Sequence, residues 1–346
     1  MSSAPEVYVT NFNPNFTGVS ATIAALYPHQ KYDLRLVGAQ LPGCPKPLGK
    51  AEAIRMSSAR PDGKPFAIWH VRRNTEMRAA IWARDVLRKP IKLVFTSAAK
   101  HRHSALPRWL ISRMDAVIAT SDEAADLVPH VRATVPHGVD TDRFVPSEDR
   151  AAAWAKTGYG GKRGVACVGR VRSGKGTDRF VDTMLRVLPE QKDITALVIG
   201  RASPQDRGFI EALKRKVAAA GLSDRLLFIG EIGRDEMPAL YRSLSLLVPL
   251  PRYEPYGLTP IEGMASGVPF VASDTGYFKH FSMDGRAGHV VEAEDAHLLV
   301  TELLANPDRL AQLGAEARKV AVETFSIHSE ANGISQVYEE LWADAR

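Results

Sequence analysis

The stretch RYEPYGLTPIEGMASGVPFVASDTG, residues 252–276, decides how the rest of this 346-residue chain can be interpreted. Glycines and prolines divide it, and both residue types mark breaks between elements. Thr259 suits a helix N-cap, Pro260 the first helical position, and Gly267 the residue just past the end. The apolar run 268–273 then predicts a buried strand of a parallel sheet. The order is therefore loop, short helix, buried strand.

Two carboxylates bracket the start of this predicted helix, Glu254 in the loop and Glu262 within the first turn. Free N–H groups and partial positive charge at a helix N-terminus favour a phosphate. A carboxylate one turn further in suits the hydroxyls of a sugar diol. An anion and a diol held together describe a nucleotide sugar. The alternative is that Thr259 and Glu262 form a capping box, T-x-x-E, with no role in binding.

A second glycine-rich stretch, GRVRSGKG at residues 169–176, follows a predicted strand at 164–169. It nearly matches a P-loop, in which Ser or Thr must follow the lysine to hold Mg²⁺. Gly176 stands there instead, and Thr177 comes one place late. The sequence therefore argues against a P-loop ATPase or kinase.

Both stretches resemble motifs of one enzyme family. EPYGLTPIE resembles the E-x7-E element of retaining glycosyltransferases of family 4. The family usually has glycine and then an aromatic residue after the first glutamate, and Pro255 and Tyr256 stand at these positions here. GRVRSGKG resembles the family's G-R-(x4)-K-G. PHGVDTDRF at residues 136–144 resembles P-N-G-V-D-T-x-x-F, with His137 in place of Asn. The resemblance implies a GT-B fold, an α/β architecture of two Rossmann-like doubly wound domains facing a central cleft.

The resemblance also implies roles for individual residues. Arg170 and Lys175 would bind the donor diphosphate, Glu262 the ribose hydroxyls, and Glu254 would lie beside the transferred sugar. Further donor contacts are expected from the first loop and from the backbone before the short helix, at Gly18, Tyr256, Gly257, Leu258 and Thr259. The family usually works without an essential metal, so neither cofactor nor metal is expected.

The N-terminal half resembles a narrower branch, the mannosyltransferases of the lipopolysaccharide core, in VTNFNPNFTGVSAT, HVRRNTEMR and TSAAKHRH. This resemblance implies GDP-mannose as donor and an anionic lipid-linked acceptor such as Kdo-lipid A. His101 or His103 would be the catalytic histidine of the family's fourth strand. Ligands of open α/β sheets lie beyond the carboxyl ends of strands. Acceptor contacts are therefore expected from His70, Arg72, Arg73, Lys100 and Arg102.

Composition and charge set the remaining expectations. The hydrophobic content is 45%, the net charge is +6, and residues 55–113 hold 14 Lys/Arg against three acids. Such a concentration suggests an anionic partner or membrane surface, while the aromatic–basic pattern of a nucleic-acid module is missing. We expect a cytoplasmic protein at the inner membrane surface, with two cysteines in a reducing setting. The expected divisions are an acceptor domain at 1–146, a donor domain at 147–326, and a final helix at 327–346 crossing back to the first domain.

Three alternatives stay open at this point. A UDP- or ADP-sugar could replace GDP-mannose without changing the motifs. A sugar-nucleotide epimerase of the same fold would also bind a nucleotide sugar, but would have no acceptor surface. A membrane- or polyanion-binding protein with a degenerate site would use the basic segment equally well.

Overall fold

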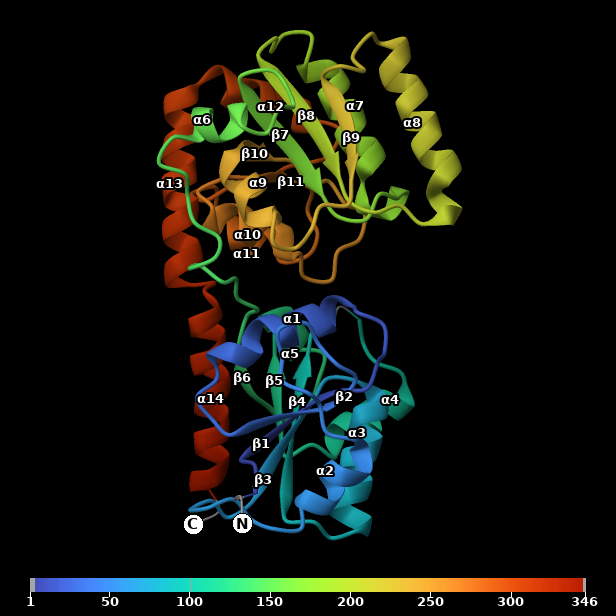
Figure 1. Cartoon of the computed structure of the whole chain (residues 1–346), viewed down its shortest axis with the longest axis vertical. Helices are drawn as coiled ribbons and strands as arrows, with labels where there is room; N and C mark the ends of the chain where they lie inside the picture. The colour runs from blue at the N-terminus through green and yellow to red at the C-terminus, as the bar shows by residue number, and fades with distance from the viewer. Residues whose placement is uncertain (1–3, 100, 345–346) are drawn as a thin grey trace. The chain divides into compact units, whose positions relative to one another are not determined.

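The computed structural model describes residues 4–99 and 101–344. The chain divides into two compact units, each with its own parallel sheet (Figure 1). Unit 1 comprises residues 1–138 together with 327–346, and unit 2 comprises residues 139–326.

Unit 1 is built on a six-stranded parallel sheet in the order β2-β1-β3-β4-β5-β6. The strands are β1 Val7–Asn11, β2 Leu34–Gly38, β3 Ala67–Val71, β4 Ile91–Ser97, β5 Ala116–Ala119 and β6 Val131–Thr134. The chain moves to one side of β1 for β2 and to the other side for β3. The switch point of this doubly wound sheet therefore lies between β1 and β3, where ligands of such sheets bind.

Helices cover both faces of this sheet. They are α1 Gly18–Leu26, η1 Tyr27–His29, α2 Lys50–Met56, α3 Asn74–Ile81, the π-turn η2 Trp82–Val86, α4 Ala105–Ser112, α5 Asp122–Ala125 and α14 Ile327–Ala343. Side chains of α1 and α14 share one core with Val9 and Ile68, while α3 and α4 share the other with Trp69. This alternation follows from the period of two along a strand.

The final helix α14 belongs to unit 1 by its packing. Its apolar positions at 3-4 spacing, among them Ile334, Tyr338 and Trp342, are buried in the core of unit 1. The indole nitrogen of Trp342 donates to the carbonyl of Phe66 at 3.0 Å.

Unit 2 has a four-stranded parallel sheet in the order β10-β7-β8-β9, extended by the pair β11-β12 through a bridge from Leu247 to Phe270. The strands are β7 Arg163–Val168, β8 Ile194–Ile199, β9 Leu226–Gly230, β10 Leu244–Leu247, β11 Val271–Ala272 and β12 His289–Val290. Across the sheet, the first strand of the unit is flanked by the second and the fourth. This is a doubly wound order whose switch point lies between β7 and β10.

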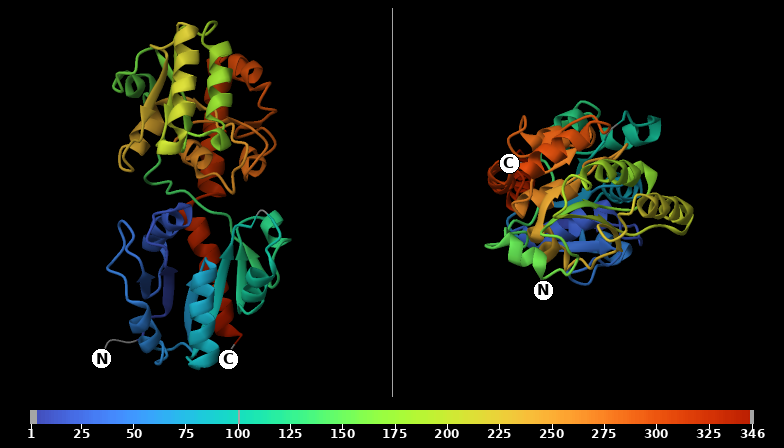
Figure 2. Two further views of the ribbon diagram at one scale, coloured as in Figure 1. Left: turned by 90° about the vertical axis from the view of Figure 1, so that its right-hand side faces the viewer. Right: turned by 90° about the horizontal axis from the view of Figure 1, so that it is seen from above.

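The helices of unit 2 again cover both faces of its sheet. They are α6 Arg150–Ala155, η3 Ser173–Lys175, α7 Thr177–Val187, η4 Pro204–Asp206, α8 Arg207–Ala219, α9 Met237–Ser243, α10 Leu258–Ala265, α11 Phe278–Ser282, α12 Ala296–Ala305 and α13 Pro307–Glu323. Helices α7 and α8 lie side by side (Figures 1 and 2). They share a core with α12 and the start of α13, while α10 and the rest of α13 pack in the other core.

The structure differs from the sequence-based expectations in local detail. The division between units falls after Gly138 rather than after residue 146, because the Val139 amide donates to the Phe325 carbonyl and Phe144 packs on Tyr241 in unit 2. Helices α2 and α4 were not predicted. The expected strand 268–273 is shorter, with only Val271–Ala272 in β11.

Candidate functional site

Some of the donor residues expected from sequence converge at the switch point of unit 2. A cavity there is lined by the end of β7, the following loop, and the segment after β10. Four expected donor residues line it: Arg170, Lys175, Glu254 and Thr259. They come from two stretches about eighty positions apart in the sequence, and the fold brings them to one edge of the sheet.

Lys175 and Glu254 form an ion pair in this cavity. The ammonium nitrogen of Lys175 donates to Oε2 of Glu254 at 2.5 Å. The backbone amide of Glu254 donates to the hydroxyl of Thr275 at 3.2 Å, which fixes the position of the loop. Arg170 lines the same cavity with an exposed side chain. The site therefore holds one paired cation and one cation that reaches solvent.

Gly257 sets where helix α10 begins. Its φ of +95° is the left-handed conformation, and a Cβ there would lie 2.2 Å from Cε1 of Phe278. The helix starts at Leu258 with Gly257 as its N-cap, so the expected N-cap at Thr259 was wrong. Thr259 is instead the second helical residue, and its side chain lines the cavity.

The backbone around this helix start remains able to contact a ligand, but one side chain does not. The ring of Tyr256 is buried and stacks on Tyr277, with ring centres 5.3 Å apart. The first-turn N–H groups of α10, at Leu258 and Thr259, have no intrahelical carbonyl to bond. Tyr256 can therefore take part only through its backbone.

Glu262 lies in the second turn of α10 and does not form a capping box. Its Oε2 accepts a hydrogen bond from the hydroxyl of Tyr241 at 2.8 Å. Burial raises the pKa of Glu262 to about 7, against the lowering effects of Tyr241 and of Arg143 and Arg234. A carboxyl group with one oxygen engaged and a pKa near neutrality has one oxygen left for a ligand. Glu262 is not among the residues that line the cavity of Arg170 and Lys175.

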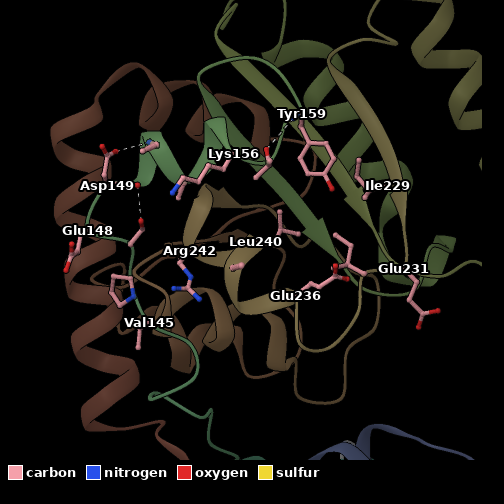
Figure 3. A pocket seen from close by; sticks show the side chains of 17 residues that line it. Val145, Glu148, Asp149, Lys156, Tyr159, Ile229, Glu231, Glu236, Leu240 and Arg242 are labelled. Atoms are coloured by element: carbon pink, nitrogen blue, oxygen red, sulfur yellow. Dashed lines mark hydrogen bonds between the residues drawn. The ribbon is translucent and has the colours of Figure 1, made fainter.

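A larger hollow of unit 2 shares no lining residue with this cavity (Figure 3). It is bordered by α6, α9 and the end of β9, with Lys156, Glu231, Glu236 and Arg242 among its polar side chains. The labelled charged groups point in different directions around its rim (Figure 3). Size alone does not make it the better site, because its polar groups do not converge on one point.

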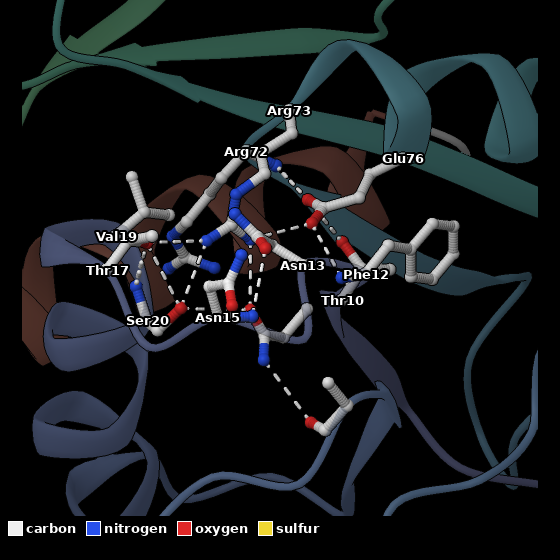
Figure 4. A network of polar contacts seen from close by, with 12 residues as sticks. Thr10, Phe12, Asn13, Asn15, Thr17, Val19, Ser20, Arg72, Arg73 and Glu76 are labelled. Carbon is white, nitrogen blue, oxygen red and sulfur yellow. Dashed lines mark hydrogen bonds and ion pairs between the residues drawn. The ribbon is translucent and has the colours of Figure 1, made fainter.

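A polar network occupies the switch point of unit 1 (Figure 4). At its centre is the fully buried carboxylate of Glu76, which sequence reasoning missed. Oε1 accepts from the Phe12 amide at 3.0 Å and from the Arg73 guanidinium at 2.9 Å. Oε2 accepts from the Thr10 hydroxyl at 2.9 Å and the Arg72 amide at 2.8 Å. Glu76 thereby ties the ends of β1 and β3 together.

Arg73 completes the network rather than facing a ligand. One terminal nitrogen donates to Asn11 at 3.0 Å and to Glu76, and the other donates to the hydroxyls of Thr17 and Ser20 at 3.0 and 3.1 Å. Thr17 is the N-cap of α1, so Arg73 positions the start of that helix. Gly18, the first residue of α1, is exposed, and a Cβ there would have no neighbour within 4 Å.

Arg72 differs from its neighbour. Its Nε and one terminal nitrogen are buried without a hydrogen-bond partner. Burial lowers the pKa of Arg72, and the adjacent charge of Arg73 adds to this effect. In Figure 4 the Arg72 side chain extends toward Thr17 and Val19 at the start of α1. Buried donors without acceptors are uncommon in proteins and suit an anionic ligand.

The expected acceptor role of His70 was wrong. The side chain is 0% exposed inside β3, with Nδ1 2.5 Å from the Tyr338 hydroxyl and Nε2 2.6 Å from the Thr96 hydroxyl. Burial holds the pKa of His70 well below its usual range. His70 is therefore a neutral histidine of the core whose two nitrogens are both engaged.

The other predicted residues of unit 1 lie in the loop between β4 and α4. His101 and Arg102 are exposed, and Nε2 of His103 is buried without a hydrogen-bond partner. Lys100 lies outside the described residues. In this loop, Arg102 and the Nε2 atom of His103 are therefore the groups that a ligand could contact.

Among residues 4–99 and 101–344, no group of three or more His, Cys, Asp or Glu side chains could hold a metal ion. Within the same residues, no helix is long and apolar enough to cross a bilayer.

Comparisons with known proteins agree with these features. A family described as glycosyl transferases group 1 matches residues 150–320. The lipopolysaccharide core biosynthesis mannosyltransferase LpsB of Rhizobium meliloti (strain 1021) is 41% identical over 345 residues, covering 97% of this chain and 97% of that protein. The enzyme of the same description, LpcC of Rhizobium leguminosarum bv. viciae, is 40% identical over 349 residues, covering 99% and 98%.

A solved structure adds the fold. HepE of Anabaena in complex with UDP superposes with a TM-score of 0.82 at 16% identity, covering 97% of this chain and 100% of that chain. At this identity the likeness concerns the fold alone. The predicted fold class, two doubly wound α/β domains of the GT-B type, is confirmed, as is the prediction of a glycosyltransferase. The chain belongs to the group 1 glycosyltransferases.

Proposed function

We propose that this glycosyltransferase moves mannose from GDP-mannose to an anionic, lipid-linked acceptor of the lipopolysaccharide core, with retention of configuration. The observation that carries the proposal is the convergence of Arg170, Lys175, Glu254 and Thr259 on one cavity at the switch point of unit 2. The two relatives at 40 and 41% identity, both described as lipopolysaccharide core mannosyltransferases, support the sugar and the pathway.

In this proposal the cations of unit 2 receive the donor diphosphate. Lys175 is held by Glu254, so an arriving diphosphate competes for a lysine that is already oriented. Arg170 supplies a second, exposed cation. Fixed cations stabilise the charge that develops on a leaving diphosphate more than they stabilise the bound donor. The acceptor hydroxyl attacks from the face that the diphosphate leaves, and the diphosphate takes its proton.

The proposed roles of the two glutamates follow from their surroundings. Glu254, released from Lys175 when the diphosphate binds, would accept hydrogen bonds from the transferred sugar. Glu262 would hold the ribose hydroxyls through the oxygen that Tyr241 leaves open. A diol donates two hydrogen bonds, so the ionised form of Glu262 is the better partner.

In unit 1, the proposed anion contact of the acceptor is Arg72. Two of its nitrogens are buried without partners, whereas the guanidinium of Arg73 already makes four hydrogen bonds. A carboxylate or phosphate of an inner-core glycolipid such as Kdo-lipid A would give Arg72 the acceptor that the protein does not supply.

The first test is a donor screen by thermal shift and slow hydrolysis, comparing GDP-mannose with UDP- and ADP-sugars. A ligand at a hundred times its Kd stabilises by about 2.7 kcal/mol, so a true donor gives a clear shift. Lys175→Met should remove the GDP-mannose shift, while Lys156→Met, at the larger hollow of unit 2, should leave it unchanged. A shift with a UDP- or ADP-sugar alone contradicts the mannose assignment. Slow hydrolysis without acceptor is compatible with a glycosyltransferase, so the epimerase is favoured instead by conversion of the nucleotide sugar to its epimer, with no rise in nucleotide release when acceptor is added.

A further inference from the structure

Two neighbouring helices of unit 1 carry large apolar side chains on their outer faces. In the segment of α3 and η2, Trp82 and Val86 are 49% and 63% exposed. In α4, Leu106 and Trp109 are 57% and 56% exposed. Spacings of four and three residues put each pair on one face of its helix. Helices α3 and α4 pack against each other (Figure 1), and Arg113, which follows α4, pairs with Asp85 of η2 at 2.7 Å. The two pairs therefore lie on neighbouring elements.

The exposure of these side chains is not needed to complete the core. The inner faces of the same helices already contribute buried apolar residues to the core, namely Met77, Ile81, Leu110 and Ile111. Single exposed apolar residues are common on proteins, but a group of this kind marks an interaction site. We call the outer surface formed by Trp82, Val86, Leu87, Leu106 and Trp109 the tryptophan face.

Basic side chains surround the tryptophan face. Arg78, Arg88, Arg102 and Arg108 are exposed on the same helices and their flanking loops. The acidic neighbour Asp85 is already paired with Arg84 and Arg113, both within 2.7 Å. A hollow lined in part by Arg102, Arg108, Trp109 and one acid, Asp126, opens beside α4. The arginines around the face therefore outnumber its acids, and Asp85 is already paired.

This combination identifies the partner by its chemistry. Tryptophan has a large apolar body and one polar N–H, and it is enriched where hydrocarbon meets water. Exposed arginines are attracted to the anionic headgroups of a bilayer, and each one strengthens the binding of the protein to the membrane. A soluble protein partner would explain the apolar side chains but not the ring of arginines around them.

We propose that the tryptophan face docks this protein on the surface of an anionic lipid bilayer. Trp82 and Trp109 would sit at the headgroup level, with Arg88 and Arg108 contacting lipid phosphates. The inference deepens the proposed function, because a lipid-linked acceptor would be met at that surface. It rests on the exposed residues themselves and can be tested without catalysis.

The test is co-sedimentation of the full chain with phosphatidylcholine vesicles, with and without phosphatidylglycerol. The wild type should bind only the anionic vesicles. The double variant Trp82→Ser/Trp109→Ser should lose about tenfold or more in partition coefficient, since each indole buries a large apolar surface at the interface. Arg88→Gln/Arg108→Gln should weaken binding and flatten its dependence on salt.

Matched controls separate docking from folding and from catalysis. Leu298→Ser in unit 2 removes an exposed leucine, 62% exposed, and should leave vesicle binding unchanged. Thermal shift with GDP-mannose reports the donor site independently, and the two double variants should keep the wild-type shift. Equal vesicle binding by wild type and the tryptophan double variant would overturn the proposal. So would a dimer that dissociates in that variant while the wild type ignores anionic vesicles.

Discussion

Replacing Glu76 by glutamine tests whether the network of unit 1 is as important as its geometry indicates. The carboxylate is 0% exposed and accepts four hydrogen bonds, two at each oxygen. Glutamine keeps only one of the two acceptor oxygens, because the other is replaced by an amide nitrogen that is itself a donor. Either orientation points the NH2 group at two donors and removes the charge that balances Arg73. Breaking a buried ion pair from one side costs about 3–5 kcal/mol.

The assay is urea unfolding followed by tryptophan fluorescence. Four of the five tryptophans lie in unit 1, namely Trp69, Trp82, Trp109 and Trp342, so the signal reports mainly that unit. Urea unfolding slopes are about 1–3 kcal/mol per molar, so a loss of this size shifts the midpoint by about 1 M or more. The matched control is Glu52→Gln, which removes an exposed carboxylate from helix α2 of the same unit.

The result for the two variants decides the matter. We expect Glu76→Gln to unfold at clearly lower urea, with Glu52→Gln close to wild type, since exposed substitutions usually change stability by less than about 0.5 kcal/mol. If both variants unfold at the wild-type midpoint, the hydrogen bonds at Glu76 contribute no net stability. The role given to this network in fixing the first loop would then be refuted.

Three further predictions concern single positions. Gly257→Ala should destabilise unit 2 by more than about 1 kcal/mol and abolish the GDP-mannose thermal shift. The φ of Gly257 is +95°, and a Cβ there would lie 2.2 Å from Phe278. The control Gly208→Ala in helix α8 should be neutral or stabilising. The pKa of Glu262 rises on folding from 4.5 to about 7, so the unfolded state loses its proton first as pH rises. The stability that this group contributes, at most about 3 kcal/mol, is therefore present below pH 4.5 and is lost as the pH rises to about 7. Glu262→Gln should make the urea midpoint less dependent on pH across that range. Arg72→Gln should raise KM for the acceptor at unchanged or higher stability, because two of its nitrogens are buried without partners; a loss of stability with an unchanged KM would contradict its assignment.

Much of the fold followed from the sequence because its signals are local. Apolar runs alternating with helical periods predicted two doubly wound units, and glycines and prolines located the loops that border the cavity of unit 2. Lys175 and Glu254 were expected in one site, and they are in fact bonded to each other. Helix α4 was missed because it has only eight residues and contains Pro107.

The errors in the site arose where partners are distant in sequence. His70 was expected to face a ligand because it comes at the carboxyl end of a predicted strand, but Tyr338, 268 positions away, supplies a buried partner. Glu76 was overlooked because the Thr10 hydroxyl that it binds is 66 positions away. The one local signal for a buried role of Glu76 was its position as the third residue of a helix that follows a strand. Periodicity detects such helices but does not show which side chains they bury.

The most direct test of the central claim is transfer of labelled mannose from GDP-mannose to Kdo-lipid A or its mannose-free core extension, with the product identified by mass and by anomeric configuration. We predict a lipid product heavier by one hexose, in the α configuration that retention requires, and no product from the Lys175→Met variant. Absence of any mannosylated lipid from a protein that binds GDP-mannose would contradict the proposed acceptor. An inverted product would contradict the proposed mechanism.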